Sequence, residues 1–300
     1  MAEITRISFH DQIQKNKIKS IVLMGIIIAF FILLGYVISL VFDQSYFFII
    51  MIISIIFSIG YTYYGYYNSD KISLRSVGAY PASPTAHRQY FHSVEGLCLA
   101  SGLPIPRLFV MPGEQINAFA SGRDLKNAVI CVTEGSLRKL NKQEMEGVLA
   151  HELSHIANYD IRFMTLTAVL VGMVAIAAEI FLRSMWLGGG GGGRNRNGRG
   201  QAVLLLLGIL LSILAPIAVK IVQLAVSRKR EYVADAHAVK LTRYPDGLIN
   251  ALSKIKDDKP MKVNKAVASL FLSDPFKRKV QNLFSTHPPL ETRIEVLRRM

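Results

Sequence analysis

The sequence predicts a mainly α-helical membrane protein whose soluble domain combines helices with a small antiparallel β-sheet. Three observations lead to this fold class. Two apolar runs of full membrane length come first, helix-like and strand-like segments follow, and a second apolar pair interrupts them. Hydrophobic residues make up 51% of the 300 residues, and they are concentrated most densely in these four runs. Such a distribution is typical of a membrane anchor joined to a modest soluble part.

Residues 1–67 are predicted to form a basic cytoplasmic tail and a transmembrane hairpin. Its spans, at about 21–42 and 46–67, each contain 22 residues without a charge, which is enough to cross a bilayer. No small-residue cleavage site follows the first run, so we expect a retained span and not a signal peptide. Basic residues flank the hairpin and are absent from its turn, which places both of its ends in the cytoplasm.

Residues 68–162 form the first part of the predicted soluble domain. An amphipathic helix over 85–101 is expected to end at Gly102 and Pro104. Short runs of strand-forming composition follow, separated by turn residues, and they predict the antiparallel sheet. These runs are residues 107–111, 116–121 and 128–133.

Residues 163–220 predict a second hydrophobic hairpin. Its two runs, 163–178 and 202–219, contain 16 and 18 residues, which is the lower limit for a span. The hairpin therefore either crosses the bilayer or lies against it, and both interpretations stay open. The connection at 188–200 is rich in Gly and Arg and is predicted to be flexible. Residues 221–300 return to the soluble domain as its second, helical and basic part.

The strongest functional signal is the run His151-Glu-Leu-Ser-His155. Asn141 and Glu144 form a capping-box pattern that predicts the start of the helix carrying this run. Residues four apart share one face of a helix, so both imidazoles can bind one metal ion. Glu152 would stand beside them as a general base, as in zinc hydrolases. The alternative is a surface helix with two unconnected histidines.

A catalytic zinc site needs a third protein ligand besides two histidines. A third histidine six residues after His155 is excluded, because Ile161 occupies that position. Glu231 and Asp235 lie four apart on a predicted helix, so one can bind the metal while the other holds a ligating imidazole. The alternative is a solvated charged face, since basic residues precede Glu231. Weaker candidates for the third ligand are His237, Asp160 and Glu179.

The formal net charge of +14 raises the question of a polyanionic partner. No nucleic-acid motif accompanies the charge, so we expect contact with anionic lipid headgroups and not with nucleic acid. Cys98 and Cys131 lack metal-binding spacing and are predicted to be core thiols on the reducing side of a membrane.

Four motifs together give the chain a resemblance to a known family. They are Asn117-Ala-Phe-Ala120, His151-Glu-Leu-Ser-His155, Ser227-Arg-Lys-Arg-Glu-Tyr-Val-Ala-Asp235, and Thr286-His-Pro-Pro289 followed by Arg293. In this order they resemble the HtpX-type membrane zinc metalloproteases, which are relatives of the CAAX-prenyl endopeptidases. The likeness covers nearly the whole chain and implies a gluzincin-like catalytic domain.

The resemblance implies one zinc ion, Zn2+, per chain. The implied metal ligands are His151, His155 and Glu231. Glu152 would be the catalytic base, and Asp235 would support a ligand. His287 and Arg293 are candidates for stabilising the transition state, although His287 is equally well explained as a helix-entry residue before two prolines. The residues expected to border the substrate cleft are Asn117, Ala118, Phe119 and Ala120. Such a strand at a sheet edge can pair with an extended substrate.

The expected function is that of a membrane-bound zinc endopeptidase that degrades misfolded or damaged membrane proteins, in quality control and stress response. Its partners would be unfolded protein substrates and the lipid bilayer. It would reside in the cell membrane as a multi-pass protein with its active site facing the cytoplasm. Two alternatives are the processing of a lipidated peptide and a scaffold with a structural metal site. The sequence predicts neither the oligomeric state nor the physiological substrate.

Overall fold

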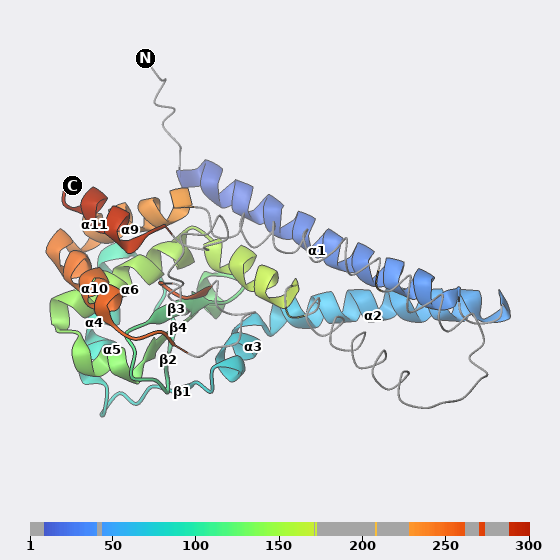
Figure 1. Ribbon diagram of the computed structural model, residues 1–300, viewed down its shortest axis with the longest axis horizontal. Helices are drawn as coiled ribbons and strands as arrows, with labels where there is room; N and C mark the ends of the chain where they lie inside the picture. The colour runs from blue at the N-terminus through green and yellow to red at the C-terminus, as the bar shows by residue number, and fades with distance from the viewer. Residues whose placement is uncertain are drawn as a thin grey trace, which may run out of the picture.

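The computed structural model describes residues 9–40, 44–170, 172, 208, 228–261, 270–273 and 288–300. Two helices, α1 (Phe9–Ser39) and α2 (Phe47–Tyr67), pack along each other and project as a long pair from a compact part (Figure 1). The compact part contains the sheet and the remaining described helices.

The projecting pair has the length and composition of membrane spans. The segments Ile13–Val37 and Gln44–Tyr67 are both long and apolar enough to cross a bilayer. Large apolar side chains lie exposed along α2, including Phe48 at 74% and Ile56 at 66%. Lipid, unlike water, would solvate such a surface favourably. Helix α1 begins at Phe9, well before residue 21, so much of the basic tail is helical as well.

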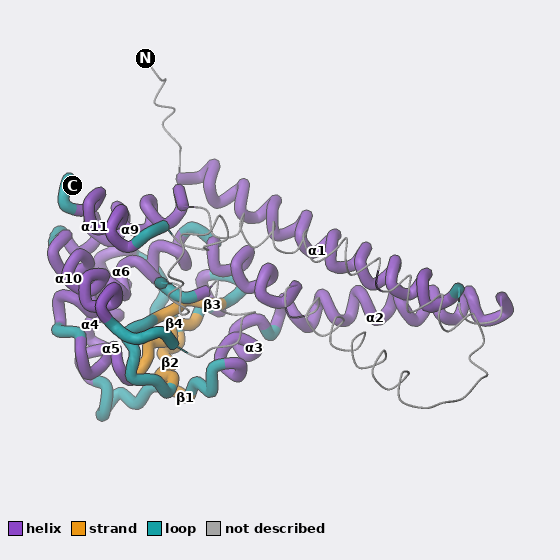
Figure 2. Tube along the Cα trace, viewed as in Figure 1, coloured by secondary structure: helices purple, strands orange, loops and turns teal. Residues whose placement is uncertain are grey.

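The sheet contains four strands in the order β1-β2-β4-β3 (Figure 2). Strands β1 and β2 are antiparallel, β2 and β4 are parallel, and β4 and β3 are antiparallel. The prediction of an antiparallel sheet is therefore wrong at the centre. After β2 the chain crosses the end of the sheet and returns along the far side of β4, which makes β2 and β4 run in the same direction. The strands are β1 (Tyr80–Pro81), β2 (Arg107–Met111), β3 (Ala118–Ser121) and β4 (Val129–Thr133).

Both faces of the sheet are buried, and alternate residues of the strands serve different cores. Val110 and Ala120 belong to the core that also holds Leu149 of the helix α6 (Lys142–Ala157). Phe109 and Phe119 lie on the opposite face, in a second cluster. The period of two puts the small side chain of Ala120, and not the ring of Phe119, on the α6 face.

Three helices, α4 (Arg88–Ser101), α9 (Arg228–Thr242) and α10 (Pro245–Asp257), pack against α6. Gly147 allows the closest approach, because a Cβ at this position would lie 2.7 Å from the backbone nitrogen of Leu248. Pro245 occupies the first turn of α10, where a missing N–H costs nothing. Other helices of the compact part are α3 (Ser69–Ser76), α5 (Glu134–Lys139) and α11 (Leu290–Leu297). Short 3-10 turns span Gln44–Tyr46 and Leu125–Asn127.

The chain continues as a helix over residues 160–170. Its side chains Phe163, Leu166 and Leu170 pack against Leu23 and Ile27 of α1. Nearly all of the predicted second hairpin, together with its Gly- and Arg-rich connection, lies outside the described residues. That hairpin therefore stays a prediction.

Candidate metal centre

Helix α6 begins where the capping box predicts. The Asn141 side chain accepts a hydrogen bond from the Glu144 amide at 2.9 Å, and Glu144 accepts one from the Asn141 amide at 2.8 Å. Lys254 of α10 pairs with the Glu144 carboxylate at 2.6 Å. This cap fixes the start of the helix, and the helical repeat then places His151 and His155 on one buried face.

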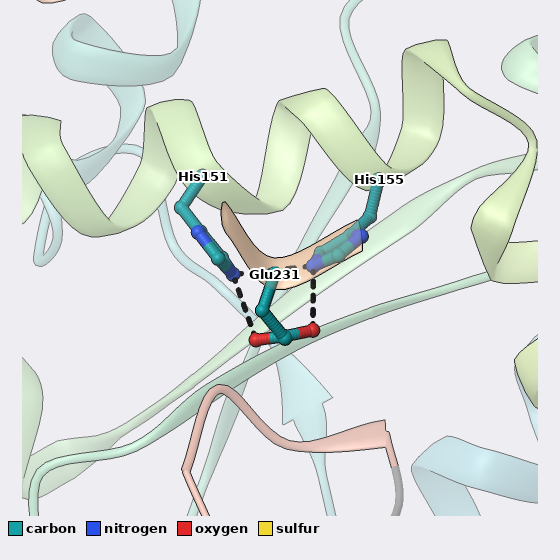
Figure 3. Close-up of side chains that lie close together, drawn as sticks. All are labelled: His151, His155 and Glu231. Atoms are coloured by element: carbon teal, nitrogen blue, oxygen red, sulfur yellow. Dashed lines mark hydrogen bonds and ion pairs between the residues drawn. The ribbon is translucent and has the colours of Figure 1, made fainter. Parts of the chain in front are cut away.

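Three side chains from two helices converge on one point (Figure 3). The two Nε2 atoms of His151 and His155 lie 3.1 Å apart. Glu231 of α9 places one carboxylate oxygen 3.7 Å from His151 Nε2 and the other 3.5 Å from His155 Nε2. All three side chains are buried. The structure thus brings together the three residues that the sequence predicts as ligands.

These distances suit a small tetrahedral cation. Ligands about 2.0–2.2 Å from a tetrahedral zinc lie about 3.3–3.6 Å from one another. The two imidazole nitrogens, 3.1 Å apart, and the distances of 3.5 and 3.7 Å from each of them to its nearer Glu231 oxygen lie close to that range. Two imidazoles and one carboxylate also match a known catalytic zinc ligand set, which leaves a fourth position for water or substrate. The residues present therefore fit zinc.

Each histidine has a carboxylate behind it. His151 Nδ1 lies 2.9 Å from an Asp235 oxygen, and His155 Nδ1 lies 3.1 Å from an Asp160 oxygen. A carboxylate next to Nδ1 holds the proton on that nitrogen and leaves the Nε2 lone pair free for a metal. Both imidazoles are therefore oriented as ligands. Asp160, weighed in the sequence as a third ligand, instead supports one.

The two imidazoles differ in their affinity for protons. Burial, together with the positive charge of Arg293, lowers the pKa of His151 to about 4, so this ring is neutral. Burial also disfavours charge on His155, but the hydrogen bond that its ring donates to Asp160 and the negative charge of Glu231 outweigh the burial and raise its pKa to about 9. Without a metal, a proton would therefore separate the two facing nitrogens. Metal binding must release it.

Glu152 lies next to the ligands and is 1% exposed. Burial raises its pKa to about 7, while the backbone amide of Ala120 and the charge of His155 act in the opposite direction. Its buried Oε1 atom has no hydrogen-bond partner among the described residues. An unpaired acceptor beside a metal site is costly unless a water or a substrate occupies the space. This atom fits the predicted general base.

Arg293 of α11 is fully buried and contacts the ligands from behind. Its Nε and Nη2 donate to the two oxygens of Asp235 at 2.9 and 2.6 Å. Its Nη1 donates to the Leu272 carbonyl at 3.0 Å and lies 3.4 Å from a Glu231 oxygen. The guanidinium holds the pKa of Asp235 below its usual range, despite the burial of that carboxyl. These contacts indicate that Arg293 positions Asp235 and Glu231, and its predicted role at the transition state stays a prediction.

Of the remaining candidates, His237 is the one that the structure describes. His237 lies on α9 but outside the group of three ligands. Glu179 and His287 lie outside the described residues, so their proposed roles stay predictions.

Strand β3 lies at the edge of the sheet, as predicted for a substrate-binding strand. Asn117 directly precedes it. The outer edge is not fully open, because the Leu272 amide donates to the Ala118 carbonyl at 2.8 Å and Phe271 pairs with Phe119. The role of β3 in substrate binding stays a prediction. Farther along β3, the backbone amide of Ala120 lies near the Glu152 carboxylate.

A protein-family model matches most of this chain. The model described as Peptidase family M48 matches residues 84–300, which include every described residue of the cluster. The chain belongs to peptidase family M48. M48 peptidases are metalloproteases, and the family thus agrees with the metal-binding geometry and with the resemblance drawn from the four motifs.

Several relatives are similar over almost their whole length. A protease HtpX homolog from Caldanaerobacter subterraneus subsp. tengcongensis is 42% identical across 86% of this chain and 94% of that protein. The homolog from Dictyoglomus thermophilum is 40% identical across 98% of this chain and 95% of its own. The homolog from Streptococcus pyogenes is 39% identical across 97% and 99%, respectively. The predicted relationship to HtpX-type proteases is confirmed.

Among solved structures, the crystal structure of S. mikatae Ste24p is similar, with a TM-score of 0.50 and 21% identity. The likeness covers 94% of this chain and 65% of that one, so this M48 chain spans about two thirds of the length of Ste24p. At this identity the likeness concerns the fold alone.

Sequence reasoning missed several neighbours of the ligands in this M48 chain. The segment 270–273 along β3 and Asn16 of α1 next to Asp160 had no assigned place in the site, and Asp160 was considered as a ligand but not as the partner of His155. A polar Asn at the head of an apolar span was the one available signal, because a buried amide needs partners.

Proposed function

We propose that this M48 peptidase is a membrane-bound zinc endopeptidase that hydrolyses peptide bonds in unfolded or damaged proteins, as part of protein quality control and stress response. One observation carries the proposal. His151, His155 and Glu231 converge on one point, and the free carboxylate oxygen of Glu152 lies beside them. A structural zinc site would instead be closed by four protein ligands and would have no use for an adjacent base.

In this proposal each residue has a separate task. His151, His155 and Glu231 hold the metal, with Asp235 and Asp160 fixing the two imidazoles. When bound, zinc would polarise the scissile carbonyl and make water a better nucleophile. Glu152 accepts the proton from the attacking water and returns it to the leaving amine. Its raised pKa, about 7, places both of its protonation states within reach at neutral pH.

We further propose that β3 binds the substrate through its backbone. The small side chains of Ala118 and Ala120 face α6, so the strand can approach an extended chain closely. Backbone pairing accepts almost any sequence, which suits an enzyme acting on unfolded proteins. Pairing would start at Ala120, next to Glu152, or displace Phe271 from Phe119.

Ala120→Pro should leave the protein folded and zinc-loaded while lowering kcat/KM on an unfolded protein by about tenfold or more, the cost of one lost hydrogen bond beside the base. The backbone of Asn117 hydrogen-bonds inward to Thr133 of β4, and that of Ala118 hydrogen-bonds outward to Leu272. Because the direction alternates along a strand, the Phe119 amide points toward β4 and the Ala120 amide points outward. Phe119→Pro should accordingly disrupt the sheet.

Kinetics and zinc content of Ala120→Pro, compared with Ala120→Gly as the control that retains the amide, test this assignment. If Ala120→Pro folds, binds zinc and cleaves at the normal rate, β3 does not hold the substrate.

The function itself is tested with the purified full-length chain in detergent. We expect about one zinc per chain, together with cleavage of casein that a zinc chelator stops and added zinc restores. Zinc without cleavage of any substrate would favour a scaffold with a structural metal. Cleavage confined to a prenylated peptide would favour processing of lipidated substrates.

The proposed orientation places the N-terminus, α6 and the C-terminus in the cytoplasm of a multi-pass cell-membrane protein. A reporter fused after residue 75 should then be active only in the cytoplasm, because basic residues flank the first hairpin. A reporter active only on the outer side would reverse the orientation. Substitution Gly191→Cys and labelling with an impermeant reagent test the second hairpin separately, and labelling of intact cells is expected if it spans.

A further inference from the structure

We propose that the transmembrane helix α1 is part of the metal centre, with Asn16 as a positioning residue for the ligand His155. The inference rests on the proposed function, in that it takes His155 to bind zinc. It concerns the turn at residues 158–160, which follows α6 and connects it to the helix over 160–170.

The turn is strained and serves to bring a carboxylate back toward α6. Tyr159 has a φ of 57°, a left-handed conformation that a residue with a bulky side chain rarely adopts. Such a conformation persists only where its surroundings hold it in place. Its result is that Asp160, only five residues after His155, reaches the Nδ1 atom of that ligand at 3.1 Å.

Asn16 holds this turn from both sides. Its side-chain amide donates one hydrogen bond to the Asn158 carbonyl at 3.0 Å and another to an Asp160 oxygen at 2.7 Å. Both N–H groups of the amide are therefore used, and they bracket the left-handed Tyr159. The Nζ atom of Lys17, also on α1, lies 4.7 Å from the centre of the Tyr159 ring.

The contacts of Asp160 extend from α1 to the third ligand. Asp160 presents one oxygen to His155, and the other lies near both Asn16 and Arg230, whose Nη1 atom is 3.5 Å away. Arg230 directly precedes Glu231, and its Nη1 atom also donates to the side-chain oxygen Oδ1 of Asn16 at 3.4 Å. Asn16 thus contacts Asp160, which orients the ligand His155, and Arg230, which directly precedes the ligand Glu231.

These contacts are not explained if α1 serves as a membrane anchor alone. Asn16 lies within the candidate span Ile13–Val37, is 4% exposed, and would be costly there without hydrogen-bond partners. Among the described residues, the hydrogen bonds of its side chain go to the turn and to α9, and not to the neighbouring helix α2. The hairpin therefore sets the position of Asp160, and through Asp160 the orientation of the His155 imidazole.

The test measures metal binding, which is independent of catalysis. Zinc affinity of the full-length protein is determined by competition with a chelator, and the absorption spectrum of the cobalt-substituted protein reports the ligand geometry. Asp160→Asn and Asn16→Leu should each weaken zinc binding, by roughly 10–100-fold and about tenfold respectively, and change the cobalt spectrum. The double variant should be no weaker than Asp160→Asn alone, because Asn16 acts through Asp160.

Ser20→Ala is the matched control. Ser20 is also buried on α1, one turn from Asn16, but its hydroxyl donates within the helix to the Asn16 carbonyl and does not touch the turn. It should bind both metals as wild type does. If Asn16→Leu fails to fold, Asn16→Asp keeps the size of the side chain while removing both N–H donors, and it should show the same loss.

Wild-type affinity and spectrum in the Asn16 variants would overturn the proposal, as would losses that simply add in the double variant. The outcome is separate from that of the proposed function. A wild type that binds zinc but cleaves nothing would contradict the peptidase, whereas the dependence of zinc affinity on Asn16 would still be decided by the metal measurements.

Discussion

Glu152→Gln should retain zinc and lose peptide hydrolysis by roughly 10²–10⁴-fold or more, the usual contribution of a general acid–base. The amide has nearly the same shape as the carboxylate but cannot accept the proton of the attacking water. Glu152 does not belong to the group of three ligands, so the metal should stay in place. Zinc content and casein cleavage are measured on the same preparation.

Glu146→Gln is the appropriate control for this variant. Glu146 lies on the same helix, six residues earlier. Its side chain is 30% exposed, and among the described residues its ion-pair partner is Lys142 at 3.9 Å. This variant should cleave casein like wild type. Glu152→Gln with bound zinc and activity within about tenfold of wild type would remove Glu152 from the mechanism.

The second large effect concerns α9. Glu231→Ala should abolish tight zinc retention, because it removes one of three protein ligands. Asp235→Ala should weaken zinc binding by roughly 10–100-fold, because His151 loses the carboxylate that orients it. It should also destabilise the fold by about 3–5 kcal/mol, since Arg293 would keep a buried charge without its bidentate partner.

Metal analysis of the dialysed variants and their thermal unfolding separate these effects. His237→Ala serves as the control on the same helix, because His237 lies outside the cluster and its loss should leave zinc in place. If Asp235→Ala loses all zinc while Glu231→Ala retains it, the roles of the two carboxylates must be exchanged.

The parts of the site that sequence predicts are those fixed by local geometry. Asn141 and Glu144 lie three residues apart, and the predicted capping box is present. The pair His151 and His155 follows from the helical repeat alone. Helix α4, predicted to stop at Gly102, does end there, with a left-handed φ of 69° at that glycine. Contacts within one helix depend on neighbours in the chain, which the sequence displays directly.

The parts that escape prediction depend on segments far apart in the chain. The composition of residues 107–111 and 128–133 predicts two strands. It does not predict that these strands, β2 and β4, pair in parallel. No sequence pattern identifies the partner of Arg293, and only the fold brings its guanidinium into contact with Asp235. The covering of β3 at Phe119 by Phe271 is likewise a result of tertiary structure.

The helix α1 illustrates both cases. Its apolar run predicts a span from residue 21, and the composition of that run is sufficient for this. The helix nevertheless begins at Phe9, because the preceding polar residues continue it along the folded domain. The hydrogen-bond partners of Asn16 in the turn after α6, Asn158 and Asp160, lie more than a hundred residues away in the sequence.

The central claim is that two histidines of α6 and Glu231 of α9 hold a catalytic zinc. The most direct measurement is X-ray absorption at the zinc edge of the purified wild-type protein. We expect a single zinc surrounded by imidazole nitrogens and oxygens at about 2.0–2.2 Å, without sulfur. Sulfur scattering at about 2.3 Å, which only ligation by a cysteine such as Cys98 or Cys131 would explain, or the absence of zinc altogether would contradict this account.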